Sequence, residues 1–285
     1  MNKEDRIKIY TETVDIVMDG EYVTPGDELR EFIYQDEMVK GTKFYGKKVK
    51  IDHDALERYD TYIDVNEVDC LNMAMHLQLN LGLNPAVLNM ASFHTPGGGV
   101  TRGSAAQEES IFRRTNIFMS LYQFNEIGKQ YGVDQREERY PLDYNFGGIY
   151  TPSVTVFRTP ESDGCQLMEH PFTVDVISVP AVKRPRVENG KLVPWVVDTL
   201  KNKIRQIFDI ALENGNDSLV LSAFGCGAYG TPPNEMARLF KEVLDSKNYK
   251  GVFKEIRFAI LDVPSTNGEH NPDGNIKPFK EIFGK

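Results

Sequence analysis

Short apolar segments alternate with amphipathic ones from residue 61 to the end of the chain. The apolar segments that predict strands are "TYIDV", "AVLNMA", "FTVDVISVP", "SLVLSAF" and "EIRFAILD". Most of them are apolar without alternation, which is typical of strands buried on both faces of a sheet. We therefore expect an α/β fold in which a mostly parallel or mixed sheet is sandwiched by helices.

The segments between these strands have helical spacing. One of them, residues 66–82, closes with a glycine stop, and "SAAQEESIFRRTNIFMSLYQF" offers Ser104 as an N-cap with Gln107 three residues later, a capping box. Before residue 61 we predict a helix that ends at Gly20, a short helix near Glu28–Tyr34 and an edge strand at "KKVKIDH".

Composition limits the function classes. The chain of 285 residues can form one large core, so we expect a single domain with an N-terminal helical extension over about residues 1–60 and a core over 61–285. A net charge of −9 argues against general nucleic-acid binding, and we find neither a membrane span nor a secretory signal. These features favour a cytoplasmic monomer, or a nuclear one in a eukaryote. Three widely spaced cysteines without a CxxC pair indicate reduced thiols.

Two glycine-rich loops follow predicted strands. "HTPGGGVTRG" follows "AVLNMA", and "GCGAYGTPP" follows "SLVLSAF", with a helix expected to begin near Pro232 or Pro233. Glycine allows close approach of backbone N–H groups to an anion, so a diphosphate could lie between the two loops. Neither loop has the spacing of a Walker A motif or of GxGxxG. The glycines could instead serve only to form tight turns. Tyr229 could be an ordinary packing residue, and Cys226 is more typical of a buried thiol than of a nucleophile.

Glu108 and Glu109 follow the first glycine loop. Acidic residues at a helix start commonly offset the helix dipole, and this role alone could explain why the two glutamates are there. Their attachment to the triple glycine favours catalysis instead, because a carboxyl group next to a bound diphosphate could act on a glycosidic bond.

The stretch "PGGGVTRGSAAQEE" resembles the GGG-(six to eight)-QEE signature of poly(ADP-ribose) glycohydrolases, with seven residues between Gly99 and Gln107. Further segments, among them "GGIYTPSVTVFR" and "VLSAFGCGAYG", resemble the bacterial-type, microbial branch of that family in the same order. "SFHTPGGG" departs from the family pattern at His94 and Thr95, which bears on contacts with the polymer chain more than on the catalytic step.

The resemblance implies a macrodomain-like fold that binds ADP-ribose without metal or cofactor. It implies that Glu109 is the catalytic acid and that Glu108 assists. It also implies that the ligand contacts Asn89, Gly97, Gly98, Gly99, Val100, Gln107, Val179, Pro180, Ala181, Gly225, Cys226, Gly227, Ala228 and Tyr229.

The expected substrate is poly(ADP-ribose) or ADP-ribosylated protein, and the expected product is ADP-ribose. Glu109 would arrive protonated, protonate the leaving ribose oxygen and then accept a proton from water. Two alternatives use the same pocket: a hydrolase that removes single ADP-ribose units from protein or DNA, and a non-catalytic ADP-ribose reader. The sequence leaves open whether cleavage is exo or endo. The loop between Tyr122 and Gly148 is a candidate determinant of substrate preference.

Overall fold

The structure, a computed structural model, describes residues 1–262 and 268–284. Its main sheet has seven strands: five neighbouring strands are mutually parallel, the sixth pairs antiparallel with them, and the edge strand pairs antiparallel with the sixth. In spatial order the strands are β3 (Lys43–Tyr45), β6 (Gly148–Arg158), β7 (Leu167–Val179), β5 (Pro85–Met90), β10 (Ser218–Leu221), β11 (Glu255–Ala259) and β4 (Tyr62–Asn66). The expected mixed sheet is confirmed.

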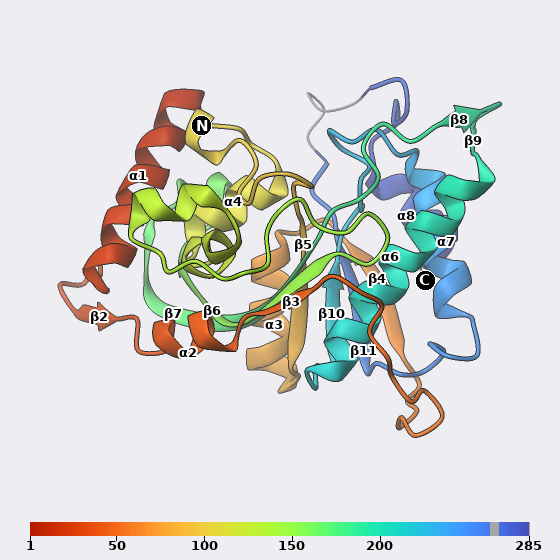
Figure 1. The fold of residues 1–285 in the computed structure, drawn as a ribbon, viewed down its shortest axis with the longest axis horizontal. Helices are drawn as coiled ribbons and strands as arrows, with labels where there is room; N and C mark the ends of the chain where they lie inside the picture. The colour runs from red at the N-terminus through yellow and green to blue at the C-terminus, as the bar shows by residue number, and fades with distance from the viewer. Residues whose placement is uncertain (263–267, 285) are drawn as a thin grey trace.

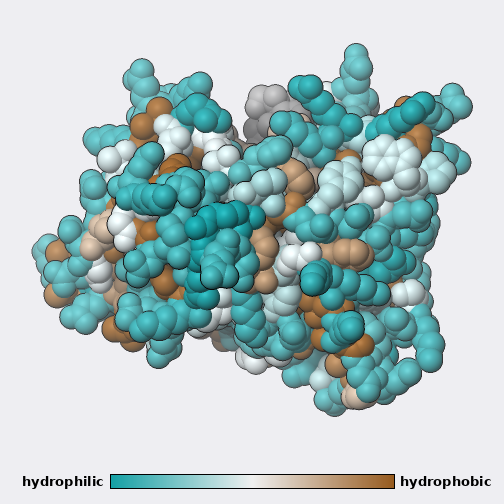
Figure 2. Space-filling view, viewed as in Figure 1, coloured by the Kyte–Doolittle hydropathy of each residue, from teal (hydrophilic) through white to brown (hydrophobic). Residues whose placement is uncertain are grey.

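Helices cover both faces of this sheet (Figure 1). They are α1 (Lys3–Asp19), α2 (Gln35–Gly41), α3 (Cys70–Leu81), α4 (Gln107–Arg114), α5 (Phe118–Leu121), α6 (Pro194–Glu213), α7 (Pro233–Leu244) and α8 (Ile276–Phe283). The core residues of α6, α7 and α8 belong to one buried cluster, and those of α1, α3 and α4 to another. Hydrophilic side chains cover most of the face shown in Figure 2. In the part of the chain that the structure describes, no helix has the length and apolar composition that a membrane span requires.

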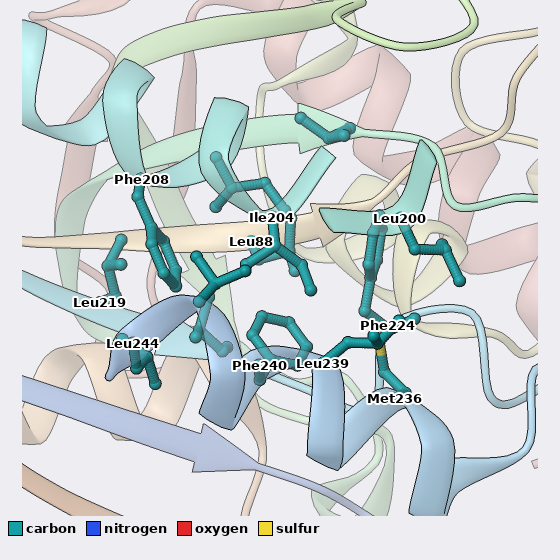
Figure 3. Close-up of a cluster of buried hydrophobic side chains, with 14 of the residues drawn as sticks. Leu88, Leu200, Ile204, Phe208, Leu219, Phe224, Met236, Leu239, Phe240 and Leu244 are labelled. Carbon is teal, nitrogen blue, oxygen red and sulfur yellow. The ribbon is translucent and has the colours of Figure 1, made fainter. Parts of the chain in front are cut away.

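Each central strand contributes to both clusters because successive side chains point to opposite faces. Leu88 and Leu219 face α6 and α7, whereas Val87 and Val220 belong to the cluster under α3 and α4. Figure 3 shows Leu88 and Leu219 among side chains from α6 such as Ile204. Continuous apolar strands in the sequence are therefore explained by two cores that share one sheet.

Two N-terminal predictions were wrong. Residues 28–34 contain no helix; instead β1 (Glu21–Val23) and β2 (Leu29–Glu31) form a small antiparallel hairpin. The segment "KKVKIDH" is not a strand, and the edge strand is β3. The backbone N–H of Val49 donates to Gln206 Oε1 on α6 at 3.1 Å, so this segment bonds to a helix side chain rather than to the sheet.

The helix that follows the first glycine loop also differs from the prediction. Its N-cap is Ala106, which makes no side-chain cap, so Ser104 does not form the expected capping box. The helix ends at Arg114, where Thr115 forms a bridge with Val156 and Asn116 Oδ1 accepts a hydrogen bond from Thr155 N at 2.9 Å. Pairing with β6 interrupts a helical pattern that the sequence continues to residue 124.

Candidate active site

The two glycine loops lie next to each other at the carboxyl ends of the strands of the main sheet. They follow β5 and β10, which are neighbouring parallel strands, so both leave the sheet at carboxyl ends. The backbone N–H of Phe93, just after β5, donates to the Tyr229 hydroxyl at 3.1 Å. This contact joins the two loops directly, so the two sequence motifs lie side by side in the structure.

Glu108 holds the first loop closed. Its Oε2 accepts a hydrogen bond from Ser92 N at 2.7 Å, and its Oε1 accepts one from Gly97 N at 3.0 Å. Burial raises the pKa of the Glu108 carboxyl to about 8, although both N–H groups favour its charged form. Both oxygens of Glu108 are thus occupied by hydrogen bonds from the backbone.

Glu109 is held on one side only. Its Oε1 accepts a hydrogen bond from Gly99 N at 2.8 Å, and among the described residues no donor reaches Oε2. The side chain is buried, yet one of its oxygens stays free for another partner. The two acids lie in the first turn of α4, where adjacent residues can reach one loop despite pointing about 100° apart along a helix.

Gly98 packs against both carboxyl groups. A Cβ atom at Gly98 would lie 2.7 Å from Glu109 Oε1 and 3.2 Å from Glu108 Oε2, and the residue has a φ of +53°. Only glycine combines this backbone conformation with so close an approach. At this position of the run, glycine is required by the carboxyl groups behind it.

The first loop does not present a free amide nest. The N–H groups of Gly97 and Gly99 bind the two glutamates, that of Gly98 donates to Thr95 O and that of Val100 donates to Gly97 O. In the structure each of these four amides already has an acceptor inside the chain, and the expected contact of Gly97–Val100 with the ligand stays a prediction.

The second loop does have free amides. Among the described residues, the N–H groups of Gly227, Ala228 and Tyr229 have no acceptor, and a Cβ at Gly227 would meet no atom within 4 Å. Three successive unpaired N–H groups in a loop form the kind of concavity that binds phosphate oxygens. The candidate phosphate site therefore lies on the second loop.

Gln107 and Asn89 support the site from behind. Gln107 Oε1 accepts from Met90 N at 2.8 Å, and its Nε2 donates to Leu88 O at 2.7 Å, so the carboxamide continues the β5 ladder where β10 no longer pairs with it. Asn89 is fully buried, donates to Ser178 Oγ at 3.0 Å and partly opposes the rise in the pKa of Glu108 that burial causes. Both side chains orient the acids.

The remaining predicted residues lie between the loops. Val179 ends β7 and accepts a hydrogen bond from Ala91 N at 3.2 Å. A Cβ at Gly225 would lie 2.7 Å from the Cβ of Ala181, so the chain after β7, which includes Pro180, packs against the second loop. Cys226 is fully buried, as are the other two free cysteines, which agrees with the expectation of reduced thiols.

Two buried arginines fix the far end of α4. Arg114 Nη1 lies 2.8 Å from Asp69 Oδ2, while Asp69 Oδ1 caps α3 by accepting from Leu71 N and Asn72 N. Arg113 donates to Ser104 O at 2.7 Å. The helix that carries the acids is therefore tied to both α3 and the glycine loop.

The loop between Tyr122 and Gly148, named above as a candidate determinant of substrate preference, contributes individual residues to the site that the sequence did not predict. The buried Tyr140 lies close enough to Glu108 for that acid to help raise the tyrosine pKa. Leu142 N donates to Phe93 O at 3.3 Å, and the Tyr144 ring lies edge-on to Phe93 at 6.2 Å. These residues follow no periodic pattern, and nothing in the sequence alone would place them beside the acids.

Lys203 on α6 is buried beneath this loop, with its ammonium 5.7 Å from the Tyr144 ring and without a hydrogen-bond partner among the described residues. Burial lowers the pKa of Lys203 to about 8, with Asp143 opposing the shift. The pKa of Lys203 is lower in the folded than in the unfolded protein, so the buried charge lowers the free energy of unfolding. This destabilisation is complete at neutral pH and disappears above about pH 10.5. We expect Lys203→Met to raise the free energy of unfolding at pH 7 by roughly 1 to 3 kcal/mol, and by less at pH 10.

Denaturant unfolding at the two pH values checks this, with Lys201→Met as the matched control. Lys201 lies on the same helix but pairs with Glu242 at 2.6 Å in a partly exposed position, so its removal should change stability by less than about 1 kcal/mol. A clear loss of stability in Lys203→Met would show instead that the buried ammonium is favourably paired.

Comparison with known families and structures places this geometry in context. The sequence profile described as microbial-type PARG, catalytic domain, matches residues 11–159, a range that includes the glycine loop and both acids. The chain belongs to the microbial-type poly(ADP-ribose) glycohydrolase family. The expectation drawn from the signature is thereby confirmed at the level of family and enzyme class. A search of curated proteins found no match.

Solved poly(ADP-ribose) glycohydrolase structures resemble the whole chain. The enzyme from Thermomonospora curvata bound to the inhibitor ADP-HPD is 30% identical, with a TM-score of 0.77 over 98% of this chain and 99% of that chain. The enzyme from Deinococcus radiodurans in complex with ADP-ribose is 28% identical, with a TM-score of 0.67 over 87% of this chain and 96% of that chain. The likeness to poly(ADP-ribose) glycohydrolases thus extends well beyond residue 159 and includes the second loop.

Proposed function

We propose that this glycohydrolase cleaves the ribose–ribose O-glycosidic bonds of poly(ADP-ribose) and releases ADP-ribose, with Glu109 as general acid and base. The observation that carries the proposal is the asymmetry of the two acids: Glu108 is bonded on both oxygens, whereas Glu109 has one oxygen free. A proton-transfer group needs an unoccupied oxygen that can contact the reacting atoms.

In the proposed reaction, Glu109 protonates the oxygen of the departing ribose as the glycosidic bond breaks. The same carboxylate then accepts a proton from the water that attacks the oxocarbenium-like carbon. Glu108 keeps the loop in register and positions the leaving ribose. The macrodomain-like arrangement of the two loops would place the diphosphate on the free amides of Gly227, Ala228 and Tyr229, with Tyr229 near the distal ribose and Val179–Ala181 bordering the adenosine.

Product analysis tests this function. The enzyme is incubated with purified poly(ADP-ribose), with protein carrying single ADP-ribose units and with ADP-ribosylated DNA, and the released nucleotides are separated by chromatography. Release of ADP-ribose from the polymer, at a rate well above that from the other two, supports the proposal. Release only from singly modified protein or DNA would assign the site to mono-ADP-ribosyl hydrolysis, and binding without release would make it a reader.

We also expect turnover and ADP-ribose binding to be independent of divalent metal. The proposed steps use carboxyl groups and backbone amides, and among residues 1–262 and 268–284 no three His, Cys, Asp or Glu side chains gather as a metal site requires. Activity should be unchanged after dialysis against a chelator. Loss of activity that Mg²⁺ or another divalent ion restores would contradict this mechanism.

A further inference from the structure

A second cavity, of about 740 Å³, lies away from the acids, between α6, the segment before β4 and the turn after α7. None of the residues that line it belongs to the glycine loops or to α4. In Figure 1 this segment is the orange chain beside α6, at the lower right. Its volume lies within the range of about 300–1,000 Å³ that small-molecule sites occupy.

The rim of this cavity is cationic. Lys48, Lys50, Arg205 and Lys247 line it, in a chain whose net charge is −9. Among the described residues, Lys48, Lys50 and Arg205 form no ion pair, and Lys247 has only an exposed contact with Asp54 at 3.3 Å. Exposed pairs of that kind contribute little, so the charge of Lys247 remains available to a ligand. Lys48 and Arg205 interact electrostatically with the buried Asp209 carboxylate, which leaves four cationic side chains against one carboxylate in the lining.

The floor of the cavity is apolar and aromatic. Val49 and Tyr249 are buried there, and the His53 and Tyr249 rings meet edge-to-face at 4.8 Å. Asp209, the one carboxylate in the lining, is also buried and accepts a hydrogen bond from the Tyr249 hydroxyl at 2.9 Å. A cationic rim above an apolar, ring-bearing floor suits a ligand that joins a phosphate to a flat base.

We propose that this cavity is a second binding site, for a phosphate-bearing nucleotide unit, with its lysines contacting the phosphates. The ligand is either another unit of poly(ADP-ribose), in which case the proposal rests on the proposed function, or a free nucleotide of the same chemistry. The basic run "KKVK" supplies two of the contacting lysines.

The test replaces the three exposed lysines, Lys48, Lys50 and Lys247, with alanine in the full chain that also carries Glu109→Gln, so that polymer is not consumed. A matched control replaces Lys40, Lys129 and Lys280, three exposed lysines outside the cavity. Binding of long poly(ADP-ribose) and of its two-unit fragment is measured by fluorescence anisotropy over a range of salt concentrations.

We expect the cavity variant to bind long polymer about tenfold more weakly, with a log–log salt slope smaller by about 2, since each lost phosphate contact removes roughly 0.7. The cavity variant should bind the two-unit fragment with unchanged affinity. The control variant should bind both ligands with unchanged affinity. Equal weakening in both variants would overturn the proposal, and so would the absence of weakening in either variant when the calorimetric titration described below also finds one ADP-ribose site per chain. Degradation of polymer by the Glu109→Gln background would instead contradict the catalytic role of Glu109.

Free ADP-ribose distinguishes the two ligand sources. Calorimetric titration that gives two sites per chain, of which the cavity variant loses one, assigns the cavity to free nucleotides. One site per chain in both variants, together with the selective loss of long-polymer binding, assigns it to the polymer. One site in both variants with unchanged polymer binding would refute the second site altogether.

Discussion

Glu109→Gln lowers the turnover of poly(ADP-ribose) by at least ~10²-fold, the usual contribution of general acid–base catalysis. Glutamine keeps the shape of the side chain and can still accept the hydrogen bond from Gly99 N, but it cannot deliver or accept the proton. ADP-ribose binding and the free energy of unfolding should therefore stay close to those of the wild type. Single-turnover kinetics, calorimetry and denaturant unfolding measure the three quantities separately.

Glu108→Gln is the informative comparison. Both Glu108 oxygens accept backbone hydrogen bonds, so an amide nitrogen would replace one acceptor and face an N–H group. This variant should lose stability as well as activity. If Glu109→Gln retains near-wild-type turnover, the proton transfer belongs to another group, with Glu108 the first to examine. If Glu109→Gln unfolds, its role is structural.

Gly98→Ala is expected to lower kcat/KM by roughly ten- to a hundredfold, because misplacement of a catalytic group by about 1 Å can cost that much. The new Cβ would lie 2.7 Å from Glu109 Oε1, so the carboxyl group must move. Steady-state kinetics on polymer measure the loss. ADP-ribose affinity should change less than kcat, since the amides expected to bind phosphate lie on the second loop.

Gly132→Ala controls for backbone strain. Gly132 also has a positive φ, of +66°, but a Cβ there would meet no atom within 4 Å. Both variants should lose about 1 to 2 kcal/mol of stability from the left-handed conformation, and only Gly98→Ala should lose activity beyond that. Equal kinetic effects in the two variants would show that a clash between the new Cβ and Glu109 is not the cause of the lost activity.

The central part of the fold could be predicted from sequence because burial on both faces leaves a simple signal. Strands such as β5 and β10 are mostly apolar, helices such as α3 and α7 have clear periodicity, and α3 ends at a glycine stop signal. The N-terminal predictions failed where elements are three residues long, as in β2 and β3, because so few residues show no period.

The sequence predicted which residues belong to the candidate site but not the hydrogen bonds that they form with one another. The signature located the acids and the first loop, and the glycines after a predicted strand located the second loop, whereas the direction of the loop amides depends on φ values and on which acceptor lies nearest. The side chains of Glu108 and Glu109 occupy the very donors that the glycine run seemed to offer a phosphate. Tyr140 and Lys203 reach the site region through tertiary packing alone.

The bond pattern of Gln107 has a consequence for protein engineering. Its carboxamide joins the first turn of α4 to the end of β5, so the signature is one rigid piece of strand, loop and helix start. Grafting "PGGGVTRGSAAQEE" onto another scaffold would transfer the residues of the motif without the end of β5, whose backbone sets the geometry of the motif. The smallest transplantable catalytic unit of this protein includes a strand of the sheet as well as the loop.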